Sequence, residues 1–409
     1  MVSPFLSPRF QMISDVRKKY NASFTDAKYQ AFLQALYKPY NYEIEFRVAE
    51  TPVFIPKALK HHVLQACREI IEVIKRPDFK ELTKNAVPPH LNVPNEDAHT
   101  QCLAIDFAIC QDKETGELIP QLIELQGFPS LYCFQQFVSA TYKEYFDIPE
   151  NFDYLFSGLT PETYLDLLRR TFIGKHAVEN VILLEVEPEK QKTKVDFYCT
   201  QDFLGIKYVC LTEVIREGRQ LFYMRDGVKT PIKRIYNRVI FDELSQRTDL
   251  KLQFNLLEDV DVEWAGHPNW FFRISKYTLP WLKSRYVPET RFLSDFTEYP
   301  KDLENYVLKP LFSFAGAGVI FNVQQSDIDA VADKENYILM KKVEYAPALQ
   351  SPDGAIKTEL RMLIVWPEED ESPTIATNLV RLGRADLMGV RFNKDKTWVG
   401  GSTAFFEKD

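Results

Sequence analysis

The hydrophobic positions follow two kinds of spacing along the first third of the chain. Apolar side chains recur at helical intervals behind Pro56 in residues 55–76, which predicts a helix buried along one face. Residues 103–110 and 118–126 are instead nearly continuous apolar runs, separated by the turn-prone residues 112–116. This arrangement predicts two buried strands joined as an antiparallel hairpin.

The middle of the chain shows a strand, helix, strand rhythm. Thr160 and Pro161 predict the start of a helix through 164–170, and residues 180–186 and 205–211 are apolar runs typical of buried strands. A helix-compatible segment lies between these two runs, so we expect a parallel sheet. The pair Asp226-Gly227 predicts a turn that brings residues 221–224 back towards 234–241.

The last third alternates the same two patterns. We expect a helix over 273–285, strands over 306–309, 319–323 and 337–343, a helix from Ser326, and two long strands over 358–366 and 374–382. The whole pattern predicts an α/β fold with mixed sheets.

Composition narrows the class of function. The 409 residues carry a formal charge of -8 with 45% hydrophobic residues, which is typical of a globular protein with more than one domain and disfavours nucleic-acid or membrane partners. No apolar stretch is long enough to span a bilayer and no signal peptide is evident, so we expect a cytoplasmic protein. Six cysteines without a CxxC pair and six scattered histidines disfavour zinc chemistry.

A lysine and small-residue loop is the sharpest local feature. In YVLKPLFSFAGAGVIF, one strand ends at Lys309 and a second follows a loop containing Gly316 and Gly318. Lysine supplies charge for a phosphate, and glycines let backbone N–H groups approach its oxygens. The segment differs from a P-loop, because no GKS or GKT sequence follows and the loop joins two strands. An ordinary glycine hairpin is the alternative.

Acidic residues interrupt the apolar hairpin. Glu124 and Gln126 are two apart on one strand and so share a face, and Asp106 lies on its partner. Two carboxylates and an amide oxygen suit Mg²⁺, since acids inside apolar strands are costly unless they are paired or bound to metal. A solvent-facing edge position is the alternative for each acid.

Basic residues accompany the apolar elements in the C-terminal half. Lys276, Lys309, Arg361 and Arg381 each lie on or beside an apolar stretch, and Arg238 is similar. Such charges would neutralise a phosphoryl group during its transfer. A salt bridge with Glu359 on the same strand face is the alternative for Arg361.

Together these segments resemble the ATP-grasp ligase superfamily, in which a lysine-bearing strand, a glycine-rich loop and a hinge strand hold ATP between two subdomains. The resemblance covers about residues 100–409 and is strongest in IELQGFPS, YVLKPLFSFAGAGV, ILMKKVEY and ELRMLIVW. The metal hairpin precedes the nucleotide loops here, as in circularly permuted members that include relatives of glutathionylspermidine synthase.

The resemblance implies a role for each matching position. Lys276 and Lys309 would bind ATP phosphates beneath a loop from Ser313 to Gly318. The hinge would be Met340, Lys341, Lys342 and Val343, with Glu344 towards the ribose. Mg²⁺ would be held by Asp106, Glu124 and Gln126. Arg361 would stabilise the transferred phosphoryl group, and the carboxylate or its phosphorylated form would be bound by Arg238 and Arg381. Gln126 departs from the usual asparagine, and Lys341-Lys342 stand where acidic or amide residues are common.

The implied activity is ligation of a carboxylate to an amine or thiol through an acyl phosphate, with release of ADP and phosphate. A small-molecule kinase and a non-catalytic nucleotide-binding protein are the alternatives. The expected division is a mainly helical segment (1–95), the metal hairpin (96–150), a pre-ATP-grasp-like α/β subdomain (151–250), a nucleotide-clamping subdomain (251–345) and the rest of the catalytic sheet (346–409). The substrates' identities and the oligomeric state stay open.

Overall fold

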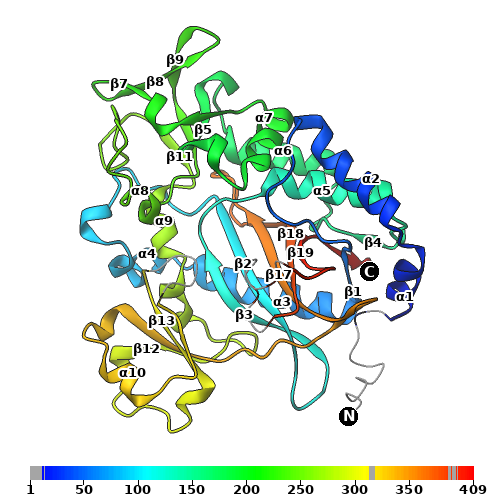
Figure 1. Cartoon of the computed structure of the whole chain (residues 1–409). Coiled ribbons are helices and arrows are strands. Elements are labelled where there is room, and N and C mark those ends of the chain that lie inside the picture. Colours follow the sequence, from blue (N-terminus) through cyan, green and yellow to red (C-terminus); the bar gives the residue numbers. More distant parts are fainter. Residues whose placement is uncertain (1–11, 13, 313–317, 386–387, 389–392, 394) are drawn as a thin grey trace.

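An antiparallel sheet, here called the central sheet, forms the middle of the protein (Figure 1). The structure is a computed structural model that describes residues 12, 14–312, 318–385, 388, 393 and 395–409. The central sheet has the order β19-β18-β17-β2-β3, and β16 pairs with β17. Its strands are β2 (Cys102–Gln111), β3 (Leu118–Gln126), β16 (Leu349–Ser351), β17 (Gly354–Val365), β18 (Thr374–Gly383) and β19 (Gly400–Ser402).

Helices from the first half of the chain cover the central sheet. They are α1 (Ser14–Ser23), α2 (Asp26–Tyr37), α3 (Lys57–Ile74), α4 (Phe79–Leu82), α5 (Tyr132–Tyr145) and α6 (Pro161–Phe172). The predicted helix over 55–76 is confirmed as α3, and its apolar stripe from Leu59 to Ile74 is buried. Thr160 caps α6 by accepting from the N–H of Thr163, as its sequence predicts. One hydrophobic core joins α2 and α3 to the central sheet.

A second, parallel sheet lies beside the central sheet and has the order β11-β10-β5-β6. Its strands are β5 (Val181–Glu185), β6 (Lys207–Cys210), β10 (Arg234–Asn237) and β11 (Glu263–Ala265), with α7 (Lys194–Leu204) between β5 and β6. The predicted parallel pairing of β5 and β6 is confirmed. Short helices α8 (Phe241–Leu244) and α9 (Pro268–Arg273) follow the later strands.

Two details differ from the sequence expectation. Asp226-Gly227 does make a turn, but it joins β8 (Gln220–Arg225) to β9 (Val228–Ile232), and these strands form a small sheet with β7 (Ile215–Glu217). Residues 234–237 enter the parallel sheet instead, because their apolar side chains are buried there on both faces. The expected helix over 273–285 is a 3-10 helix, η8 (Lys276–Trp281), since Pro280 cannot continue an α-helix.

A four-stranded antiparallel sheet, here called the clamp sheet, lies at the lower left of Figure 1 and has the order β12-β15-β13-β14. Its strands are β12 (Thr290–Phe292), β13 (Tyr306–Pro310), β14 (Ile320–Phe321) and β15 (Tyr337–Lys341), and the short helix α10 (Gln325–Asp329) lies between β14 and β15 in the sequence. Strands β1 (Val53–Ile55), β20 (Ala404–Glu407) and β4 (Phe152–Asp153) form a further small sheet. Among the described residues, no helix has the length and apolar character needed to cross a membrane.

Candidate functional site

The predicted hairpin of β2 and β3 forms with one irregularity that shapes the site. Asp106 pairs with Glu124, whereas Phe107 pairs with Leu122, so Ile123 is an extra residue on β3. Such a bulge changes the alternation of side chains along its own strand. Gln121 and Glu124 therefore point to the same face of the sheet, although they are three residues apart.

Charged residues meet on this face from four neighbouring strands. One row across the sheet contains Glu124, Asp106 and Arg361, because Asp106 pairs with both of the other two. In the next row, Glu359 of β17 pairs with Arg381 of β18. The sequence alone does not show this arrangement, because the four strands come from two distant parts of the chain.

Ion pairs join the two rows. Arg361 binds Asp106 with two parallel bonds, Nε to Oδ1 at 2.6 Å and Nη2 to Oδ2 at 2.6 Å. Arg381 Nη2 also donates to Asp106 Oδ2 at 2.8 Å and forms an ion pair with Glu359. Burial alone would raise the pKa of Asp106, but Arg361 and Arg381 outweigh it and hold that pKa below its usual value. Arg361 thus pairs with Asp106, and Glu359 pairs with Arg381.

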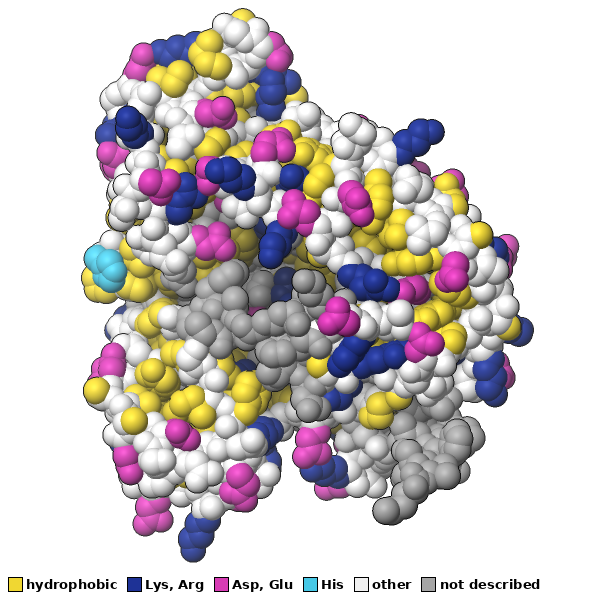
Figure 2. Space-filling model, in the orientation of Figure 1, with side chains coloured by type: hydrophobic (Ala, Val, Ile, Leu, Met, Phe, Trp, Pro, Cys, Tyr) yellow, Lys and Arg dark blue, Asp and Glu magenta, His cyan; other side chains and the backbone are white. Residues whose placement is uncertain are grey.

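A cleft of about 750 Å³ lies over this part of the sheet. Its polar lining includes Glu124, Gln126, Arg361 and Arg381 from the central sheet and Lys276 from η8. Aromatic side chains form another part of its wall, namely Phe128, Phe271, Phe272 and Phe312. Figure 2 shows Lys and Arg side chains gathered in the middle of one face of the molecule, between the upper and lower parts.

Of the two candidate phosphate lysines, Lys276 of η8 is among the described residues that line this cleft, whereas Lys309 of β13 is not. Lys309 Nζ lies 3.4 Å from the carbonyl of Ile123 and 3.3 Å from Met340 Sδ, and Lys276 Nζ donates to the carbonyl of Pro310 at 2.8 Å. Burial lowers the pKa of Lys309 to about 8; Glu124 opposes this shift and Lys276 adds to it. A bound anion would relieve the repulsion between the two lysines.

A second cleft, of about 1220 Å³, continues along the same face towards the hinge. The predicted hinge residues Lys341, Lys342 and Val343 line it, together with Glu344 and Tyr345, which follow them. Gln121 and Cys110 line it from the hairpin. Four of its lining residues, Cys110, Ile119, Val343 and Tyr345, belong to a small apolar cluster that also contains Ala108 and Ile123.

Several hinge groups already have partners. Lys342 Nζ bonds the carbonyl of Glu304 and the side chain of Asn322, and Glu344 forms an ion pair of 3.4 Å with Lys113. The N–H groups of Lys341 and Lys342 donate to backbone carbonyls. The side chains of Lys342 and Glu344 and the N–H groups of Lys341 and Lys342 are therefore bound to other parts of the protein.

The other end of the first cleft lies at the carboxyl edge of the parallel sheet. Glu185 ends β5 and Arg238 follows β10, and both line the cleft. Such an edge is the usual ligand site in parallel sheets. Arg238 packs over the rings of Phe128 and Phe197 and donates from Nη1 to the carbonyl of Pro129, while its buried Nε has no hydrogen-bond partner among the described residues.

Glu185 was missed by the sequence reasoning. It is 6% exposed, and its Oε1 accepts from the N–H of Val186 at 2.7 Å. Burial raises its pKa to about 7, against the opposing charge of Arg238. The signal that identifies it is an acidic residue at the end of the apolar run 180–186, which precedes a helix in a β-α-β unit.

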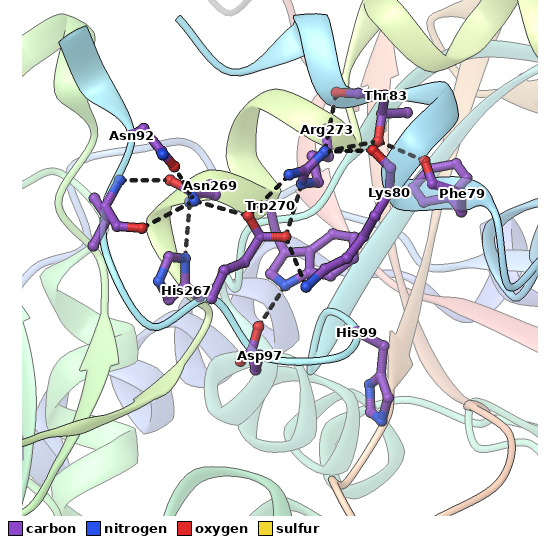
Figure 3. Close-up of polar contacts among 12 residues, drawn as sticks. Phe79, Lys80, Thr83, Asn92, Asp97, His99, His267, Asn269, Trp270 and Arg273 are labelled. Atoms are coloured by element: carbon purple, nitrogen blue, oxygen red, sulfur yellow. Dashed lines mark hydrogen bonds and ion pairs between the residues drawn. The ribbon is translucent and has the colours of Figure 1, made fainter. Parts of the chain in front are cut away.

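A polar network surrounds α9, the helix that carries Phe271 and Phe272 of the aromatic wall, and Figure 3 shows this network. Arg273 of α9 binds Glu96 through Nε at 2.8 Å and the carbonyls of Lys80 and Thr83 through Nη1. Asn269 donates to the carbonyl of Val93 at 3.1 Å and accepts from its N–H at 3.0 Å. Phe271 and Phe272 face the cleft from the same short helix, so residues 80–97 fix its orientation.

Two titratable groups lie inside this network. Trp270 Nε1 donates to Asp97 Oδ1 at 2.5 Å, and burial raises the pKa of Asp97 to about 7. His267 Nδ1 accepts from the N–H of Asn269 at 3.2 Å and its Nε2 faces the carbonyl of Pro94 at 3.0 Å. Burial lowers the pKa of His267 to about 4, so it is neutral at pH 7 and serves as a cap for α9.

The structure does not describe every predicted position. Ser313 and Gly316 of the small-residue loop lie outside the described residues. Gly318 is described and has a φ of 71°, a left-handed conformation that favours glycine. The sequence-predicted residues Glu124, Gln126, Arg238, Lys276, Arg361 and Arg381 line one cleft, and Lys341 to Glu344 line the other.

Comparison with known proteins gives a match in structure but not in sequence. No protein-family model matches the chain, and no curated protein matches it. A solved structure of a glutathione synthetase-like effector from Globodera pallida, in its apo form, superposes with a TM-score of 0.59 over 98% of this chain and 99% of that one. The chain has a glutathione synthetase-like fold. The expected mixed α/β class, consistent with ATP-grasp, is thereby confirmed, while at 11% identity the match shows the fold alone.

The glutathione synthetase-like fold accounts for the full length of the chain. Residues 12–95, for which the sequence suggested no chemistry, form part of it and pack on the central sheet. The circularly permuted order, the five-part division and the roles of individual residues stay predictions.

Proposed function

We propose that this protein is an ATP- and magnesium-dependent ligase that joins a carboxylate to an amine through an acyl phosphate. One observation carries the proposal: a single face of the central sheet runs from an apolar hinge pocket, past two lysines, to a cluster of arginines and acids. This order matches the parts of a nucleotide, from its base to its terminal phosphate, followed by a second substrate.

The nucleotide would lie between the hairpin and the clamp sheet. Its base would contact the apolar cluster that includes Val343 and Ile119, with Met340 beside Lys309. Its phosphates would contact Lys309 and Lys276, whose mutual repulsion an anion would relieve. Because Lys342 and Glu344 are already bonded elsewhere, the proposed base contacts come from apolar side chains and backbone carbonyls.

The donor set at the hairpin fits magnesium that is held partly by phosphate oxygens. Glu124 and Gln126 line the cleft 3.1 Å apart, Gln126 Nε2 to Glu124 Oε2, and rotation of the amide would present its oxygen instead. The described residues contain no group of three or more His, Cys, Asp or Glu side chains that could hold a metal ion. Mg²⁺ commonly takes one or two protein ligands and completes its shell with phosphate and water oxygens. When bound, it would neutralise phosphate charge.

The arginines would act on the substrate. Arg361 and Arg381 line the cleft next to Glu124, where they would bind the oxyanion as it is phosphorylated. Arg238, whose Nε has no partner, would bind a carboxylate at the far end, and Glu185 would bind a cationic group beside it. A substrate carboxylate would attack the terminal phosphate, and an amine would then displace phosphate from the acyl phosphate.

Calorimetric titration with a non-hydrolysable ATP analogue, with and without Mg²⁺, tests the nucleotide site. We expect binding that magnesium strengthens, and loss of that binding in Lys309→Ala. Lys301→Ala, an exposed lysine in the loop before β13, is the matched control and should bind normally. Absence of binding by the unmodified protein would refute the proposal.

Product analysis separates the remaining alternatives. A ligase releases ADP in a sustained way only when both a carboxylate and an amine are present, whereas a kinase needs one acceptor. Binding without turnover across such pairs, together with unchanged behaviour of Arg361→Gln, would favour a non-catalytic nucleotide-binding protein.

A further inference from the structure

A chain of alternating charges crosses the central sheet beneath the cleft. Tyr345, next to the hinge, donates from Oη to Glu359 Oε2 at 3.1 Å, and Glu359 forms an ion pair with Arg381. Arg381 bonds Asp106 at 2.8 Å, and Asp106 accepts both bonds of Arg361 at 2.6 Å. Two carboxylates therefore bind two guanidinium groups in one continuous series of contacts.

The acids and the bases of this chain differ in their access to the cleft. Arg361 and Arg381 belong to the cleft lining, whereas Asp106 and Glu359 do not appear among the described lining residues. Asp106 is 1% exposed and Glu359 is 6% exposed. The carboxylates thus lie behind the guanidinium groups, below the surface that a ligand would meet.

The hydrogen bonds already formed show which atoms of each group are still available to a ligand. Asp106 receives three bonds, two at one oxygen and one at the other, so both of its oxygens are occupied. Arg361 donates from Nε and Nη2 to Asp106, so its Nη1 is available to a ligand. Arg381 directs Nη2 to both acids, and its buried Nε has no hydrogen-bond partner in the part of the chain that the structure describes.

We propose that Asp106 and Glu359 are positioning residues that orient Arg361 and Arg381 towards a substrate oxyanion, and that Asp106 is not a magnesium ligand. This inference rests on the proposed function, because it requires that magnesium binds at the hairpin. Of the three predicted ligands, only Glu124 and Gln126 would then hold it. Bidentate pairing fixes the plane of a guanidinium group, so the unused donor edge of each arginine is presented in a set direction.

The role of Tyr345 follows from the same chain of bonds. Its hydroxyl occupies Glu359 Oε2, which leaves the other carboxylate oxygen of Glu359 directed at Arg381. Tyr345 also pairs with Cys110 of β2, so the hinge and the arginine cluster share one support. Loss of the hydroxyl should loosen Arg381 without removing any charge.

The test compares D106N, E359Q and E124Q by two binding measurements. Calorimetry gives the Mg²⁺ concentration at which affinity for a non-hydrolysable ATP analogue is half-maximal, and a second titration gives the affinity for orthovanadate in the presence of ADP and saturating Mg²⁺. We expect D106N and E359Q to keep the wild-type magnesium requirement but to lose about 10- to 100-fold in vanadate affinity, as supporting residues typically do. E124Q should instead raise the magnesium requirement.

The outcomes distinguish a role in positioning the arginines from a role in binding magnesium. A magnesium requirement that rises as much in D106N as in E124Q would overturn the inference, and so would unchanged vanadate affinity in both D106N and E359Q. If D106N does not fold, as judged by thermal unfolding, the double variant D106N/R361Q, which removes both charges of the buried pair, gives the magnesium requirement in its place, and E359Q and Y345F give the vanadate affinity. Failure of the unmodified protein to bind the ATP analogue would refute the proposed function instead, so the two failures are distinguishable.

Discussion

Glu185→Gln should make the protein more stable at alkaline pH while weakening the proposed substrate site. Glu185 is 6% exposed at the end of β5, and burial raises its pKa from an ordinary 4.5 to about 7. Above pH 7 the folded protein must therefore hold a buried negative charge, which Arg238 offsets only in part. Glutamine has nearly the same shape and carries no charge, so the substitution removes this cost.

The sign and size of the effect follow from the pKa values. Because the folded pKa lies above the unfolded one, the carboxyl group contributes its full stability below about pH 4.5 and loses it as pH rises through about 7. The gap between 4.5 and about 7, at about 1.4 kcal/mol per pKa unit, corresponds to about 3 kcal/mol. We expect the stability difference between Glu185→Gln and the unmodified protein to grow by about 2 to 3 kcal/mol between pH 5 and pH 8.5.

Urea denaturation at pH 5 and pH 8.5, followed by tryptophan fluorescence, measures this difference. Glu150→Gln, which changes an exposed glutamate, is the matched control and should show no growing gap. A Glu185→Gln protein that is equally or less stable than the unmodified protein at pH 8.5 would refute the reasoning. The expected gain in stability indicates that Glu185 is retained for the cleft and not for the fold.

Three further predictions concern the walls of the cleft. Affinity for the magnesium complex of the ATP analogue should fall as pH rises from 7 to 9, because Lys309, with a pKa of about 8, loses its proton. Calorimetry should show a weaker dependence of this affinity on pH in Lys309→Arg, and an equally steep dependence would contradict the role of Lys309 in phosphate binding. Gly127→Ala should destabilise the protein by about 1 to 3 kcal/mol in denaturation experiments, since a Cβ there would lie 2.5 Å from the carbonyl oxygen of Trp270. Arg273→Leu should cost about 1 to 3 kcal/mol in the same assay, because it removes the two bonds to Glu96, which keeps Lys80 and Asn269, and the bonds to the carbonyls of Lys80 and Thr83. The loss should be much smaller in Arg76→Leu, which changes an exposed arginine.

The sequence by itself determined the local elements and the kinds of chemistry. The helical spacing from Leu59 to Ile74, the capping pair Thr160-Pro161 and the apolar runs on either side of residues 112–116 depend on near neighbours, so their pattern is readable along the chain. The same holds for Glu124 and Gln126, which two-residue spacing places on one face. The hydrophobic pattern failed where a neighbouring sheet or a proline decided the outcome, as in residues 234–237 and in η8.

Only the tertiary structure decided which charges meet. Asp106 and Arg361 are 255 residues apart, and their contact depends on the pairing of β2 with β17, which no local pattern specifies. The extra residue at Ile123 likewise follows from the register with β2. Glu185 gains its raised pKa from burial, a property of the packed cleft. Residue types set the available chemistry, but long-range strand pairing sets the distances, because electrostatic and hydrogen-bond energies depend on separations that the linear chain does not contain.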